Sequence, residues 1–197
     1  MWQDTNDKIV RRIMNVLETE KLGDELTVVK VQYALQVLLS DSEKFFILSL
    51  VFGLCQHLSE FYLAFAALVS LRVFMGGSHR KTMGGCLLSS LVNFAVILLL
   101  SEFLYLPVSA VGGVVVLLAA EIYHWTPLAS PQQLNYTDQQ RSGVKGKALS
   151  VLTFWGVAFP FLPAEWGNVV LWALIFQETE VLLVALYRSR KGAVVVQ

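Results

Sequence analysis

The residues of this chain best suited to chemistry form a short cassette, in which Arg72 is followed by Gly76-Gly77, His79 and, seven residues after the histidine, Cys86. A cysteine acts as a nucleophile in its thiolate form, which needs a nearby base or a lowered pKa. His79 can take the thiol proton, while Arg72 and the two basic residues after the histidine add positive charge. These residue types indicate acyl transfer on a cysteine.

The spacing of His79 and Cys86 sets a geometric condition. On one continuous helix, seven residues rise about 10.5 Å, which is too far for a hydrogen bond of about 3 Å. The chain must therefore fold back, and Gly76-Gly77 and Gly84-Gly85 permit the positive φ angles of such a bend. We expect Cys86 at the start of a helix, where the dipole favours a thiolate and free amides could stabilise an oxyanion.

Taken alone, each member of the cassette has a simpler interpretation. A single cysteine near a membrane interface is more often a buried small residue or an acylation site. A histidine in a loop usually has no special role. The joint occurrence of Arg72, two glycine pairs, His79 and Cys86 in one connection is what favours catalysis.

The elements that must position this cassette are hydrophobic. Of the 197 residues, 55% are hydrophobic and 15% charged, which is typical of a membrane protein rather than a soluble domain. The zero net charge suggests no nucleic-acid partner. A span needs about 20 apolar residues, and six stretches approach that length. They lie at about 45–58, 61–75, 87–104, 106–123, 148–163 and 168–187.

The positions of the basic residues predict how these stretches cross the membrane. All fifteen Lys and Arg residues fall before the first stretch, at or after the end of the second, after the fourth or after the sixth. The other three connections contain none. By the positive-inside rule, this pattern predicts six spans with both termini and the cassette in the cytoplasm. The predicted fold is therefore all-α, an integral membrane helical bundle of about six transmembrane helices.

The regions outside the spans complete this plan. Residues 5–22 are amphipathic and predict a helix on the inner membrane surface, and the polar start differs from a cleaved signal peptide. Residues 26–39 predict a second interfacial or partly buried helix, and 125–147 a polar loop. We expect one membrane-embedded domain over 1–197, with cytoplasmic or interfacial helices in 1–44, spans in 45–187 and a cytoplasmic tail in 188–197.

The cassette in this setting resembles the signature of the accessory gene regulator B (AgrB) family, membrane peptidases of peptide quorum sensing. That signature is an Arg, a Gly-containing turn with a His, and a Cys seven residues later, here Arg72, Gly77, His79 and Cys86. The resemblance covers nearly the whole chain, including Leu-Gln-Val-Leu at 35–38. The second predicted cytoplasmic loop departs from the family, because it lacks the usual Lys-Pro pair and dense basic cluster.

The resemblance implies a cysteine endopeptidase that needs no cofactor or metal. Cys86 would be the nucleophile, and His79 the base that later protonates the leaving amine. The substrate would be a short precursor peptide of the AgrD type, cut near its C-terminus and held as an acyl-enzyme. An internal Cys or Ser of the precursor would then attack, giving a cyclic thiolactone or lactone. The resemblance also implies a homodimer in the plasma membrane.

Three further residues receive roles from the resemblance. Arg72 would pair with acidic residues of the precursor's tail, with lipid phosphates as the alternative partner. Gly77 would shape the turn. Gln36 would contact the substrate or the oxyanion, with a plain interfacial position as the simpler alternative.

Two other functions are alternatives to the peptidase. A metal site could use Cys55 and His57, but the predicted topology places them across a core of roughly 30 Å from His79 and Cys86. A non-enzymatic peptide transporter or scaffold would suit interrupted helices and buried carboxylates. Polar residues within the spans are functional candidates: Glu121 and His124 could orient His79, and Glu178 and Glu180 could instead satisfy polar groups between helices. The other such residues are Asn93 and Gln177.

Overall fold

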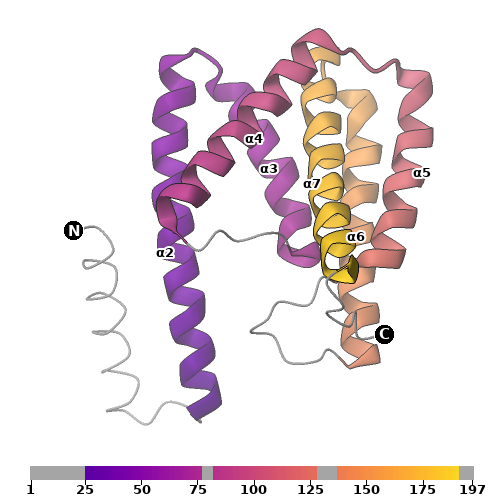
Figure 1. Ribbon diagram of the computed structural model, residues 1–197. Coiled ribbons are helices and arrows are strands. Elements are labelled where there is room, and N and C mark those ends of the chain that lie inside the picture. The colour runs from indigo at the N-terminus through magenta and orange to yellow at the C-terminus, as the bar shows by residue number, and fades with distance from the viewer. Residues whose placement is uncertain (1–24, 77–81, 128–136, 191–197) are drawn as a thin grey trace. The chain divides into compact units, whose positions relative to one another are not determined.

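The structure is a computed structural model that describes residues 25–76, 82–127 and 137–190. Within these ranges the chain is all-helical, which confirms the predicted fold class. The α-helices and one 3-10 turn are shown in Figure 1: α2 (Glu25–Leu54), α3 (Leu58–Met75), α4 (Met83–Phe103), α5 (Val108–Trp125), α6 (Asp138–Ala158), η1 (Phe159–Phe161) and α7 (Ala164–Arg190). The predicted amphipathic helix 5–22, Gly77 and His79 lie outside the described residues.

Helix α2 differs from its prediction. The stretches 26–39 and 45–58 were expected as separate elements, but one helix runs through Glu25–Leu54. The polar residues between them interrupt the hydropathy without breaking the helix. Lys44 and Asp41 lie one turn apart there, and their side chains form an ion pair of 2.6 Å.

The predicted polar loop 125–147 is also partly helical, because α6 begins at Asp138. The Thr137 hydroxyl accepts a hydrogen bond of 3.3 Å from the Gln140 amide, and the Gln140 side chain accepts one of 3.1 Å from the Thr137 amide. This reciprocal pair is a capping box, which satisfies two amides of the first turn. Residues 128–136 of the expected loop lie outside the described part of the chain.

The chain divides into two compact units. Helix α2 belongs to Met1–Gln56, and α3 to α7 form the unit His57–Gln197, called the helical unit below. The expectation of one domain over the whole chain stays a prediction.

Helix α7 organises the helical unit. It packs on α3, α4 and α5, while α6 packs on α3 and α5 (Figure 1). Half of the apolar part of α7 is buried, compared with 11% for α4. Side chains with almost no exposure come from all five helices of the unit, among them Leu71, Ile97, Ile122, Leu152 and Val170.

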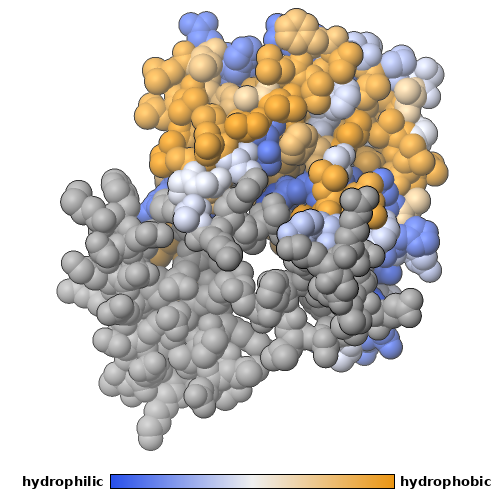
Figure 2. Space-filling model, viewed as in Figure 1, coloured by the Kyte–Doolittle hydropathy of each residue, from blue (hydrophilic) through white to orange (hydrophobic). Residues whose placement is uncertain are grey.

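Three described helices are long and apolar enough to cross a membrane. They include Leu58–Met75 of α3, Gly84–Phe103 of α4 and Ala164–Tyr187 of α7, and Ser109–Trp125 of α5 is a shorter apolar helix. Large hydrophobic side chains are exposed along these helices, for example Leu88, Val116 and Leu183, and Figure 2 shows the broad apolar surface. Such a surface suits lipid contact. The chain is therefore membrane-associated, and the count of six spans stays a prediction.

The two ends of the helical unit are named here by what they carry. The cassette end is where α3 finishes and α4 begins, with only residues 76–82 between them. The hairpin end is where α4 finishes and α5 begins, across residues 104–107. In Figure 1 these ends lie at opposite ends of the unit, and α7 runs from one toward the other.

The hairpin end is closed by neutral hydrogen bonds from the first turns of α7. The buried Asn168 amide donates to the carbonyls of Ser101, at 2.6 Å, and Leu104, at 3.1 Å. Its oxygen accepts from the Leu106 amide at 3.2 Å, and the Trp172 indole donates to the Leu104 carbonyl at 2.9 Å. Asn168 thus satisfies main-chain groups left unpaired where α4 ends.

Candidate active site at the cassette end

Cys86 lies in the first turn of α4, as predicted. Thr82 caps this helix: its hydroxyl accepts from the Gly85 amide at 3.2 Å, and its carbonyl accepts from the Cys86 amide at 3.0 Å. The Cys86 thiol is free and half-buried. The side chain therefore sits near the positive end of the α4 dipole.

The glycines of the cassette do not share one role. Gly84 and Gly85 belong to the first turn of α4, so they take no part in the bend expected of them. Gly76 caps α3 with φ 85° and ψ −168°, a conformation open essentially to glycine alone. The direction in which the chain leaves α3 therefore depends on a glycine at position 76. His79 and Gly77 follow outside the described residues.

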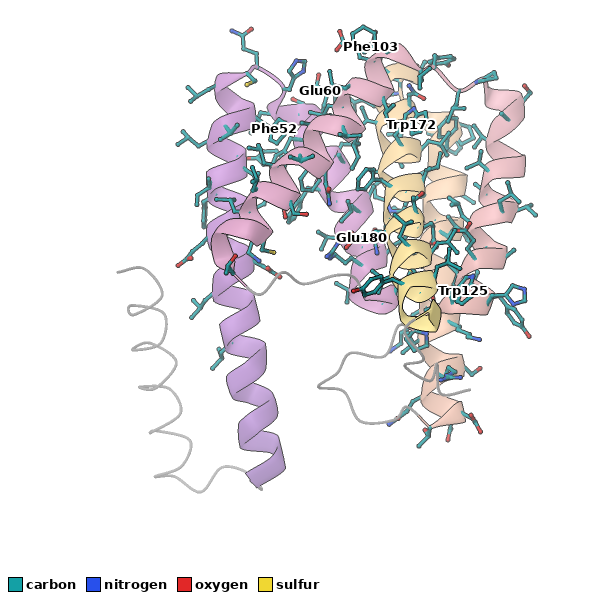
Figure 3. All side chains as sticks on the ribbon, in the orientation of Figure 1. Phe52, Glu60, Phe103, Trp125, Trp172 and Glu180 are labelled. Carbon is teal, nitrogen blue, oxygen red and sulfur yellow. The ribbon has the colours of Figure 1, made fainter. Side chains whose placement is uncertain are left out.

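Arg72 forms an ion pair that the sequence did not predict. Its two terminal nitrogens reach the two carboxylate oxygens of Glu180 on α7, at 2.7 and 3.3 Å. The side chains are 26% and 13% exposed. Figure 3 shows Glu180 on α7 beside α3, in the half of the unit nearer the cassette end. Opposite charges within spans tend to pair, but 108 residues separate these two in the chain.

Gln177 makes a second link between α7 and the end of α3. Its side-chain amide donates to the Gly76 carbonyl at 3.0 Å. Gln177 is fully buried, and it lies one turn before Glu180, on the same face of α7. Both residues therefore hold the last turn of α3, from Arg72 to Gly76.

Glu178, the residue between them, is in a different situation. It is 1% exposed, and both of its carboxylate oxygens lack a hydrogen-bond partner among the described residues. Glu121 on α5 lies close enough for the two charges to interact. His124, one turn later on α5, is exposed and packs edge-on against Tyr123.

The remaining predicted residues lie elsewhere. Gln36 is part of α2, in the other compact unit. Cys55 is an exposed free thiol, and His57 lies 4.0 Å from Glu60. In the ranges that the structure describes, no three His, Cys, Asp or Glu residues gather as metal ligands would. Asn93 is half-buried in α4.

Comparison with known proteins identifies the family. The model of the family Accessory gene regulator B matches residues 7–181. The chain is similar to a putative AgrB-like protein of Clostridium beijerinckii, with 31% identity over 158 residues, 80% of this chain and 78% of that protein. No solved structure matches the chain. This protein therefore belongs to the AgrB family of membrane proteins, which act in quorum-sensing peptide processing.

Proposed function

We propose that this protein is a membrane cysteine endopeptidase that cleaves a short precursor peptide of the AgrD type near its C-terminus. The observation that carries the proposal is the free Cys86 thiol in the first turn of α4, in a chain whose family is AgrB. The nucleophile is Cys86 and the general base is His79, seven residues earlier.

The first step forms an acyl-enzyme. His79 takes the Cys86 proton, and the thiolate attacks the scissile carbonyl, giving a tetrahedral oxyanion. The C–N bond then breaks as the imidazolium gives its proton to the leaving amine. The amides of Gly85 and Cys86 are already bound by Thr82, which leaves those of Met83 and Gly84 in this turn as candidates to stabilise the oxyanion.

The second step releases a ring. An internal Cys or Ser of the precursor attacks the thioester carbonyl, and its proton passes through His79 to the departing Cys86 sulfur. The product is a thiolactone or a lactone. Exchange of one thioester for another costs little free energy, and surroundings poor in water disfavour hydrolysis.

Cleavage of a precursor peptide by membranes containing the protein tests this proposal. Cys86→Ala and His79→Ala are each expected to abolish cleavage, because nucleophile and base are both required. Cys55→Ala is the matched control, since Cys55 is the other free cysteine and is exposed. Full activity of Cys86→Ala would refute the cysteine mechanism, whereas absence of cleavage by the wild-type protein would favour a transporter or scaffold.

We also propose that the protein is a homodimer in the cell membrane, with both termini and the cassette on the cytoplasmic side. The support for the topology is the position of the fifteen basic residues relative to the six predicted stretches: before the first, at or after the end of the second, after the fourth or after the sixth. The support for the homodimer is the resemblance to the AgrB family. Single cysteines introduced at 104–107 should react with an impermeant maleimide on intact cells. Cysteines introduced at 82–85 should react only after lysis, and the reverse pattern would contradict the topology.

A further inference from the structure

We propose that Glu180 and Gln177 of α7 are positioning residues for the cysteine site, and that Arg72 acts with them rather than by binding the precursor. The inference rests on the proposed function, because it concerns the same Cys86 site. It assigns a role to two residues outside the cassette that the family signature does not contain.

The first support is convergence on one helical turn. Glu180 holds the Arg72 guanidinium through two contacts, at 2.7 and 3.3 Å. Gln177 holds the Gly76 carbonyl at 3.0 Å. The Gly76 amide in turn donates to the Arg72 carbonyl at 2.9 Å, so both contacts fix the same closed turn. Two hydrogen bonds to one carboxylate also restrain the orientation of the guanidinium more than a single hydrogen bond would.

The second support is the place of that turn in the chain. Gly76 is the last described residue before His79, three positions later, and its φ of 85° sets the direction in which the chain leaves α3. Thr82 begins the turn that carries Cys86. Only five residues of the chain lie between Gly76 and Thr82, so the turn that Glu180 and Gln177 hold is joined to the turn of Cys86 by a short connection. A misplacement of about 1 Å can lower a rate about a hundredfold.

The third support is the surroundings of the pair. Glu180 lies within the apolar span Ala164–Tyr187 and is 13% exposed. A charge in such surroundings is costly unless it is paired. Removing one partner therefore takes away the opposite charge that Arg72 and Glu180 give each other, whereas removing both leaves neither charge to compensate. This asymmetry makes the role testable by a pair of neutral substitutions.

The test measures cleavage kinetics for Arg72→Gln, Glu180→Gln and the double variant in full-length protein, with a synthetic precursor peptide as the probe. Positioning predicts that Glu180→Gln lowers kcat about tenfold or more, while KM changes less than about twofold. The double variant should lose no more than the worse single variant and should melt at a higher temperature than either. Glu165→Gln is the matched control, because Glu165 is an exposed carboxylate in the first turn of the same helix.

Gln177→Leu gives an independent arm that removes no charge. Leucine keeps much of the volume but cannot donate to the Gly76 carbonyl, so kcat should again fall about tenfold with KM nearly constant. In a Cys55→Ala background, the rate of Cys86 alkylation at a fixed pH should change in both α7 variants. A merely structural contact would lower the melting temperature without changing this rate.

Two outcomes would overturn the inference. Wild-type kcat in both Glu180→Gln and Gln177→Leu would show that neither residue positions the site. A large rise in KM for Arg72→Gln with unchanged kinetics for Glu180→Gln would show that Arg72 binds the precursor directly. Failure of the proposed function is distinguishable, because it appears as activity in Cys86→Ala.

Discussion

The two ends of the helical unit are held by the same helix with different chemistry. At the hairpin end, Asn168 and Trp172 bind main-chain groups of 101–106 through neutral hydrogen bonds. At the cassette end, Glu180 binds a guanidinium and Gln177 a carbonyl. Twelve residues of α7, about 18 Å of rise, separate Asn168 from Glu180. Neutral amides are the cheaper way to close a helix end in apolar surroundings.

The two ends differ in whether their buried polar atoms have hydrogen-bond partners. Every side-chain polar atom of Asn168 is hydrogen-bonded. Toward the cassette end, the Gln177 oxygen and both Glu178 oxygens lack a partner among the described residues. Buried polar atoms without partners are uncommon in folded proteins and concentrate where function requires them. We therefore expect the hairpin end to govern stability and the cassette end to govern activity.

The largest effect is expected from Asn168→Leu at the hairpin end. The substitution leaves the Ser101 carbonyl without this donor and the Leu106 amide without its acceptor. An unsatisfied buried group costs about 1–3 kcal/mol, so thermal unfolding in detergent should occur at a markedly lower temperature. The kcat of the protein that remains folded should stay near the wild-type value. A loss of kcat without a loss of stability would show that the hairpin end does not act mainly on stability.

Gly76→Ala should lower both stability and activity. The loss of stability should be smaller than that of Asn168→Leu. Its φ of 85° and ψ of −168° cost about 1–3 kcal/mol for a residue with a side chain. Gly84→Ala is the matched control, because a Cβ there meets no atom within 4 Å and the residue is helical. The melting temperature and the cleavage rate should be lower for Gly76→Ala than for Gly84→Ala. Equal values would show that the bend does not depend on Gly76.

Thr82→Ala should have an effect of about 1 kcal/mol on stability, since it removes a helix N-cap. The Gly85 amide loses the hydroxyl oxygen that it now binds at 3.2 Å. Fraying of this turn should alter the rate of Cys86 alkylation, measured in a Cys55→Ala background. Thr137→Ala removes the matching cap of α6 and should leave the alkylation rate of Cys86 unchanged.

The smallest effect, and one of opposite sign, is expected from Glu178→Gln. The carboxylate is 1% exposed without a hydrogen-bond partner among the described residues, and Glu121 adds a like charge nearby. A neutral amide of nearly the same shape costs less to bury, so the melting temperature in detergent should stay equal or rise slightly. A clear fall in melting temperature would show that the carboxyl group of Glu178 makes a stabilising contact that an amide cannot replace.

The helices could largely be predicted, and the errors have definite causes. Hydropathy placed Cys86 at the start of an apolar helix, and α4 confirms it. Hydropathy also predicted two elements where α2 is one helix, because it reports how apolar a segment is and not whether the helix continues through it. The ion pair of Lys44 and Asp41 helps the helix to continue through this polar segment. Hydropathy missed the start of α6 as well, although Thr137 followed three residues later by Gln140 is a helix-start signal that could have shown it.

The sequence alone determined the membrane character, the all-α class and the family, because apolar runs and a short local signature are properties of neighbouring residues. Only the tertiary structure decided what holds the cassette end. Arg72 and Glu180 are 108 residues apart, and Gln177 and Gly76 are 101 apart. Ionic attraction and hydrogen bonding act over a few ångströms of space, and packing of α7 on α3 is what brings these groups within reach.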